Sequence, residues 1–124
     1  MPYVAVAVGG AFGAVARFAI DGWVSERTGG LFPWGTLVIN LSGAFLLGLL
    51  ATLAIDRAVL SPDIRPIAMI GFLGAYTTFS TWMLDCWRLM QDGAWALAVA
   101  NLVGSVLLGL VAVGLGVALG RLVP

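Results

Sequence analysis

Polar side chains recur at helical spacing inside three apolar segments of the chain. A spacing of four residues places side chains on one face of a helix. Amides and hydroxyls donate and accept hydrogen bonds, and they cost free energy when an apolar medium leaves them unpaired. We interpret the stripes as a hydrophilic path between packed helices. They consist of Thr36 and Asn40; Asn101 and Ser105; and Thr77, Thr81 and Asp85.

A simpler interpretation stays open for these stripes. Polar groups on neighbouring helices can bond each other and only hold a bundle together, and a serine or threonine hydroxyl can bond a carbonyl of its own helix. Asn40 fits this alternative less well, because an amide deep in a helix is costly without a partner.

The sequence shows no set of residues that could carry out catalysis. The chain has no histidine and a single cysteine, and all six of its basic residues are arginine. A nucleophile would therefore lack a nearby base, and Asp85 alone is not an acid–base pair. Cys/His metal clusters and a disulfide within the chain are excluded by the same counts. A net charge of zero argues against nucleic-acid binding. We expect a protein that is not an enzyme.

The stretch GFLGAYTTFSTW, residues 71–82, combines two glycines with a run of threonine and serine. Glycine is a poor helix former and threonine competes with the helical hydrogen bonds, so a helix break is possible here. A break frees backbone carbonyls, which would suit a small hard cation. A continuous helix with local glycine dents is the alternative. Phe79 and Trp82 are three residues apart and should project together.

The composition predicts an integral membrane protein. Of the 124 residues, 61% are hydrophobic and only 10% are charged, which exceeds the apolar share of soluble domains. Each of four apolar runs approaches or exceeds the roughly 20 residues that span a bilayer as a helix. We expect an all-α fold with four transmembrane helices in a single domain over residues 1–124. The runs are Tyr3–Ile20, Trp34–Ile55, Ile67–Trp87 and Ala94–Leu119.

The arginines give only a weak orientation signal. Arg57, Arg65 and Arg121 fall on one side of the predicted bundle, and Arg27 and Arg88 on the other, with Arg17 debatable. The positive-inside rule counts such residues in short loops. The near balance predicts insertion in both orientations, unless one added charge suffices to fix a single orientation.

Three separated motifs resemble the Fluc/CrcB family of fluoride channels. They are GAVARF at residues 13–18, GTLVIN at residues 35–40 followed by Gly43, and GFLGAYTTFST at residues 71–81. The resemblance extends over nearly the whole chain and includes its length and four-helix layout. It implies a channel that exports fluoride passively and so relieves fluoride toxicity, in the inner (plasma) membrane of a prokaryote.

The resemblance also implies an antiparallel, dual-topology homodimer with two pores along the subunit interface. Family members hold a central sodium ion through backbone carbonyls at a break in the third helix of both subunits. Those carbonyls match Gly74 and Thr77 here. The ion would be structural, because it reduces the repulsion between like dipoles at the two-fold axis.

The resemblance assigns roles to further residues along the anion path. Asn40 matches the pore asparagine and Phe79 the first pore phenylalanine, whereas Trp82 stands where a second phenylalanine is expected. Asp85 stands in place of a glutamate, and Asn101 in place of a tyrosine found in some members. Ser80, Thr81 and Ser105 match polar positions, Arg17 matches an arginine of the aqueous vestibule, and Thr36 extends the stripe of Asn40.

Two other classes share some of these features. A small dual-topology, proton-coupled multidrug antiporter has the same size, but it needs a carboxylate deep in the first helix. The first helix here carries Arg17, with Asp21 only at its predicted end. Small residues recur four apart in the last apolar run, at Ala112, Gly116 and Gly120. A non-transporting assembly subunit would explain this small-residue face but not the three polar stripes.

Overall fold

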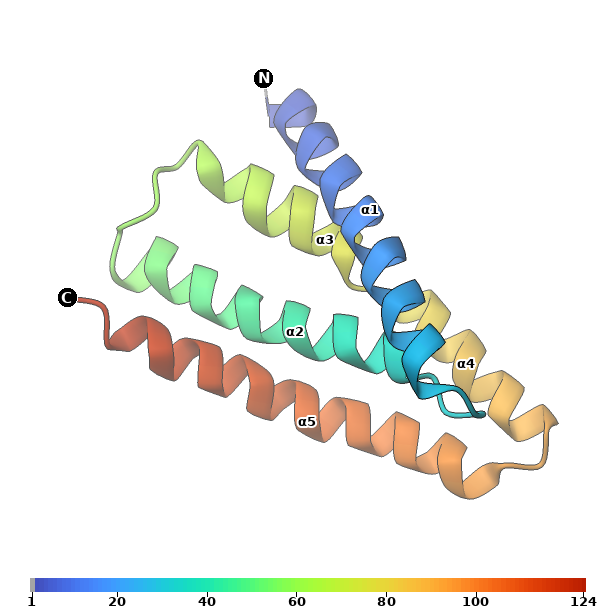
Figure 1. Ribbon diagram of the computed structural model, residues 1–124. Coiled ribbons are helices and arrows are strands. Elements are labelled where there is room, and N and C mark those ends of the chain that lie inside the picture. The colour runs from blue at the N-terminus through green and yellow to red at the C-terminus, as the bar shows by residue number, and fades with distance from the viewer. Residues whose placement is uncertain (1) are drawn as a thin grey trace.

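The computed structural model describes residues 2–124, and these residues form helices joined by short connectors, with no strand among them (Figure 1). In chain order the elements are α1 (Pro2–Thr28), α2 (Trp34–Ala51), η1 (Thr52–Asp56), η2 (Pro66–Phe72), α3 (Leu73–Tyr76), α4 (Phe79–Gln91) and α5 (Trp95–Arg121).

Four helical stretches are long and apolar enough to cross a membrane, as the sequence predicted. They are Pro2–Thr28, Trp34–Asp56, Pro66–Gln91 and Trp95–Arg121. The first differs from the expectation, which ended it at Ile20. The helix continues through Asp21 to Thr28, because polar residues end an apolar run without ending its backbone hydrogen bonds. The chain is thus an all-helical, multi-pass membrane protein.

Helices α2 and α5 lie side by side and run in the same direction, and small residues let them approach closely (Figure 1). A Cβ atom at Gly116 would lie 2.8 Å from the backbone N of Leu49, and one at Gly120 would lie 2.8 Å from Cβ of Thr52. Gly116 thus lets the backbones of α2 and α5 meet, as in many membrane helix pairs, and Gly120 leaves room for the Thr52 side chain of η1.

Helix α1 crosses the third span near its middle and contacts η2, α3 and α2 (Figure 1). A Cβ atom at Gly13 would lie 2.9 Å from the carbonyl carbon of Phe72. Seen from the other helix, a Cβ atom at Gly71 would lie 2.7 Å from the carbonyl oxygen of Val6. These are backbone atoms that cannot move aside, so this crossing requires glycine.

The connectors follow ordinary turn chemistry. Gly29 and Gly30, with φ of 59° and 76°, turn the chain between α1 and α2, and Gly93, with φ of 75°, turns it between α4 and α5. Glycine adopts these left-handed conformations without steric cost.

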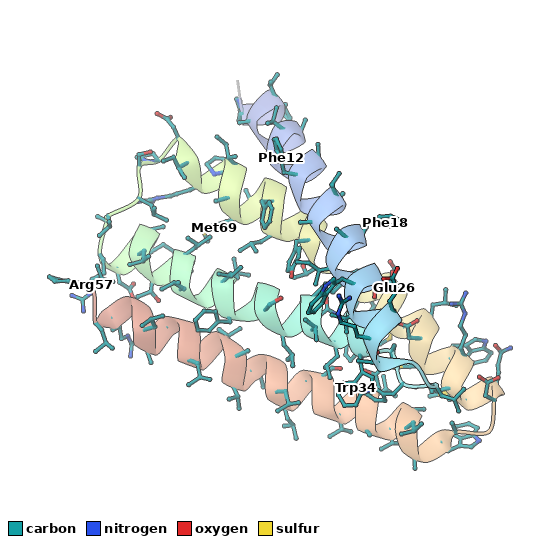
Figure 2. The ribbon with its side chains drawn as sticks, in the orientation of Figure 1. Phe12, Phe18, Glu26, Trp34, Arg57 and Met69 are labelled. Carbon is teal, nitrogen blue, oxygen red and sulfur yellow. The ribbon has the colours of Figure 1, made fainter. Side chains whose placement is uncertain are left out.

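The second and third spans each contain a π-helical segment at the end nearest their connector. In η1 the N–H of Arg57 donates to the carbonyl of Thr52 at 3.1 Å. Two guanidinium groups then bind carbonyls at this end of the bundle: Arg57 donates to Arg121 and Arg65 donates to Ala54. Figure 2 shows Arg57 beside the end of α5. The connector is thereby fastened to the helix ends.

Candidate functional site

Two extended residues separate α3 from α4 near the middle of the third span. Thr77 has φ −84° and ψ 158°, and Thr78 has φ −148° and ψ 123°. The Oγ1 atom of Thr78 accepts a hydrogen bond from the N–H of Thr81 at 3.3 Å. Thr78 is therefore the N-cap of α4, a position that threonine favours.

Asn40 on α2 pairs with the backbone of Thr78. Its Nδ2 donates to the carbonyl oxygen of Thr78 at 3.0 Å, and its Oδ1 accepts from the N–H of Thr78 at 2.9 Å. An unpaired backbone group in an apolar medium costs free energy. The two-way pairing removes that cost, so the Asn40 side chain takes the place of the missing helical partners.

Backbone carbonyls at the end of α3 lose their usual helical donors at this point, and those of Gly74 and Thr77 are two of them. In a continuous α-helix, the N–H of Thr78 would donate to the carbonyl of Gly74, and that of Thr81 to the carbonyl of Thr77. Here the first N–H donates to Asn40 and the second to the Thr78 hydroxyl. Gly74 is exposed, and a Cβ atom built on it would have nothing within 4 Å. Such oxygens are suitable ligands for a small hard cation.

A groove of about 480 Å³ opens beside the extended pair. It brings together six of the residues that sequence analysis selected: Asn40, Gly74, Thr77, Phe79, Trp82 and Ser105. Its other walls are mostly apolar, and they include Met69, which reaches from η2 toward α2 in Figure 2. The groove is therefore mostly apolar, with a few convergent polar groups.

Phe79 and Trp82 meet in this groove, as their spacing predicted. Their ring centroids are 5.7 Å apart and the rings are nearly perpendicular, at 79°. This edge-to-face arrangement sets the positive edge of one ring against the negative face of the other. The Phe79 side chain is 70% exposed in the single chain, which leaves most of its ring free to face a partner.

The indole N–H of Trp82 is engaged away from the groove. It donates to the backbone carbonyl of Asn101 on α5 at 3.2 Å. The N–H that distinguishes Trp82 from a phenylalanine thus links α4 to α5. Only the remainder of the indole ring lines the groove.

Asn101 lies behind the groove and does not line it. The residue is 1% exposed, and its Nδ2 donates to Sγ of Cys86 at 3.2 Å. Its Oδ1 accepts from the hydroxyl of Ser105 at 3.0 Å. The Asn101 amide joins α4 to α5 and fixes the direction of the Ser105 hydroxyl, which does line the groove.

Thr36, near the start of α2, and Asp85, on α4, form a second polar contact outside the groove. The Thr36 hydroxyl donates to Oδ2 of Asp85 at 2.7 Å, and it links α2 to α4. Neither residue lines the groove. Thr36 is 4% exposed, so its buried hydroxyl depends on the Asp85 carboxylate for a hydrogen-bond partner.

Three other predicted residues lie apart from the groove lining. Ser80 and Thr81 are exposed on the first turn of α4, and Arg17 is half-buried on α1. The prediction that Thr77, Thr81 and Asp85 share one helix face is wrong for Thr77. Thr77 is extended rather than helical, so spacing by four holds only for the other two.

Sequence reasoning assigned no role to Thr78, Ser42 and Tyr76. The N-cap preference of threonine before a helix was the available signal for Thr78. Ser42 and Tyr76 bond each other at 2.8 Å across 34 positions of sequence, and no local pattern signals such a contact.

The fold and groove together define a class: a small four-span helical membrane protein with a polar and aromatic groove at mid-span. A family model described as "CrcB-like protein, Camphor Resistance (CrcB)" matches residues 4–117. This chain belongs to the CrcB family.

Curated relatives resemble the chain over nearly its full length. A protein of Magnetococcus marinus named fluoride-specific ion channel FluC is 48% identical over 118 residues, which cover 95% of this chain and 96% of the relative. A protein of Hahella chejuensis with the same name is 48% identical, with 97% and 94% covered. One of Symbiobacterium thermophilum, named fluoride-specific ion channel FluC 1, is 46% identical, with 97% and 98% covered.

Proposed function

We propose that this protein is a fluoride-specific ion channel that lets fluoride leave the cell passively and so relieves fluoride toxicity. The observation that carries the proposal is identity of 46–48% over nearly full length with relatives that bear that name. The protein is a channel and not an enzyme. We place it in the inner (plasma) membrane of a prokaryote, with residues 1–124 forming one channel domain.

The groove supplies groups that a small, strongly hydrated anion needs. The Nδ2 of Asn40 carries two hydrogens, and its bond to Thr78 uses one of them. The second N–H is available to replace a water molecule of fluoride. Phe79 offers a ring edge, which carries positive quadrupole charge. Ser105 lines the same groove, with its hydroxyl turned to Asn101.

Residues outside the groove extend the proposed path. Thr36 and Asp85 would form its polar end beyond the groove, and the exposed hydroxyls of Ser80 and Thr81 would face it from α4. Arg17 would lie at the aqueous vestibule, where a positive charge raises the local concentration of anions.

A second copy of the chain would complete the path. Phe79 is 70% exposed, and the adjacent Ser80 and Thr81 are also exposed near the middle of the span Pro66–Gln91. Hydroxyls facing lipid would lack partners. We propose an antiparallel homodimer in which the partner covers this surface, with two pores along the interface. The nearly balanced arginines support dual-topology insertion.

The carbonyls of Gly74 and Thr77 would hold a structural sodium ion between the two copies. Both oxygens have lost their helical donors, and the exposed Gly74 leaves access for a partner. The bound ion would offset the repulsion between the like-oriented backbone dipoles of two copies. The described residues 2–124 contain no group of three or more His, Cys, Asp or Glu side chains that could hold a metal, so the proposed set consists of backbone carbonyls.

Growth under fluoride tests the proposed physiological role. The chain is expressed in a bacterium that lacks its own fluoride exporter, and growth is followed over increasing fluoride concentrations. We expect growth at fluoride concentrations that stop cells carrying an empty vector. Equal inhibition of both strains, with the protein present in the membrane, would contradict the proposal.

Replacing Trp82 by phenylalanine should preserve fluoride selectivity while weakening the fold. The variant loses the hydrogen bond to the Asn101 carbonyl, which is worth about 1 kcal/mol. The smaller ring also widens the groove, so fluoride flux should stay equal or rise. Thermal unfolding and liposome efflux would measure the two effects.

Trp87→Phe is the matched control for this change, because Trp87 is on the same helix and is 59% exposed. A Trp82→Phe protein that folds but no longer conducts fluoride would show that the indole N–H is itself required in the path. That result would contradict the assignment of Trp82 as a link between α4 and α5.

A further inference from the structure

We infer that Tyr76 is a positioning residue for the cation-binding carbonyls, and that it acts through a hydrogen bond to Ser42. The inference rests on the proposed sodium site at Gly74 and Thr77. Tyr76 is the last residue of α3 and directly precedes the extended pair. Its role would be to fix the end of α3 against α2, so that the two carbonyls keep one direction.

The donor in this contact follows from counting hydrogens. The Oγ of Ser42 lies 2.7 Å from the carbonyl oxygen of Val38 and 2.8 Å from the hydroxyl oxygen of Tyr76. A serine hydroxyl has one hydrogen to donate. The Ser42 hydroxyl also lies 3.2 Å from the carbonyl oxygen of Ile39, and backbone carbonyls can only accept. When Ser42 donates to these carbonyls of its own helix, the Tyr76 hydroxyl is the donor in the contact between the two side chains.

The tyrosine ring is held by packing as well as by its hydroxyl. Tyr76 is 4% exposed, and its ring stacks on Phe72 with centroids 5.7 Å apart and an interplanar angle of 14°. A Cβ atom at Gly43 would collide with Cγ2 of Thr77 and would lie 3.2 Å from Cδ1 of Tyr76, so the Thr77 methyl and the Tyr76 ring together fill the space that the glycine leaves on α2. The ring thus sits between α2 and η2 with its hydroxyl aimed at Ser42.

Helix α2 consequently forms hydrogen bonds with the third span on both sides of Thr77. Asn40 pairs with the backbone of Thr78, on the α4 side. Ser42, two positions further along α2, accepts from Tyr76 on the α3 side. Thr77 has no side-chain bond to α2, since its own hydroxyl donates to Leu73. The Thr77 methyl packs against Gly43 of α2, and the two flanking hydrogen bonds add to this contact in holding the direction of the Thr77 carbonyl.

Tyr76→Phe tests the inference, since it removes the hydroxyl and keeps the ring. The purified full-length protein is unfolded by heat in detergent over a series of sodium concentrations, with N-methylglucamine keeping the ionic strength constant. A cation that binds only the folded state raises the unfolding temperature with its concentration. We expect sodium to stabilise the wild type. The sodium midpoint, meaning the apparent Kd for sodium that is fitted to this rise, should be about threefold to tenfold higher for Tyr76→Phe, the range for one lost hydrogen bond.

Two further variants separate positioning from simple destabilisation. Tyr3→Phe is the matched control, because Tyr3 is 87% exposed, and its sodium midpoint should equal that of the wild type. Ser42→Ala removes the acceptor and should raise the midpoint as Tyr76→Phe does. The double variant should shift it no further than either single variant, since both remove the same bond.

The possible outcomes separate the role of Tyr76 from the proposed sodium site and from the proposed channel function. An unchanged sodium midpoint in Tyr76→Phe and Ser42→Ala, with a lower unfolding temperature at every sodium concentration, would make the bond merely structural and overturn the inference. No stabilisation of the wild type by sodium would overturn the cation site together with the inference. Fluoride efflux by the wild type, measured separately, would leave the channel function standing in either case.

Discussion

Asn40→Asp is expected to reduce fluoride efflux about 100-fold, because a carboxylate about 5–6 Å from the anion would repel it by about 3 kcal/mol at an effective dielectric constant of about 20, and each 1.4 kcal/mol is a factor of ten. The new oxygen would face the carbonyl of Thr78, where Nδ2 now donates at 3.0 Å. The groove would also lose its free amide N–H and gain a negative charge that repels fluoride. The acceptor for the N–H of Thr78 would remain, so the fold should suffer less than the flux.

Efflux from liposomes loaded with fluoride would measure this effect. Gln91→Glu is the matched control, because it adds the same charge at an exposed position at the end of α4, and it should conduct as the wild type does. Efflux at the wild-type rate by Asn40→Asp would remove Asn40 from the anion path.

Gly13→Ala is expected to destabilise the protein by about 1–3 kcal/mol, the usual effect of overpacking a tight contact. The added Cβ atom would lie 2.9 Å from the carbonyl carbon of Phe72 and 3.0 Å from its Cα. Both are backbone atoms of the crossing between α1 and the third span. Relief would require α1 to move away from η2, just before the residues that form the groove.

Thermal unfolding in detergent would report the loss, with Gly22→Ala as the control. Gly22 lies on the same helix, and a Cβ atom there would have nothing within 4 Å. Alanine should raise helix stability at that site by up to about 1 kcal/mol. Equal unfolding temperatures for Gly13→Ala and wild type would show that this crossing tolerates a side chain.

The four spanning helices were predictable from hydropathy alone, because a long apolar run that crosses a bilayer has to be helical. All four spans follow from runs of apolar residues, since only a helix satisfies its own backbone in lipid. The end of α1 was not predictable in this way. Residues 21–28 are polar enough to leave the bilayer core, yet they continue the helix to Thr28.

The candidate site was predictable only where its contacts are local. The spacing of Phe79 and Trp82 implied their ring contact, which the structure has at 5.7 Å. The same reasoning failed for Thr77, because spacing rules assume a continuous helix. Contacts between distant segments gave no local signal. The pairing of Asn40 with Thr78 across 38 positions and of Tyr76 with Ser42 depends on how α2 lies against the third span.

Ion-selective recording of efflux from liposomes tests the central claim most directly. The purified protein is reconstituted, the liposomes are loaded with fluoride or chloride, and release is followed with electrodes without a proton gradient. We predict rapid passive release of fluoride and no more chloride release than from protein-free liposomes. Absence of fluoride release, together with proton-coupled uptake of an organic cation, would contradict the account and identify an antiporter instead.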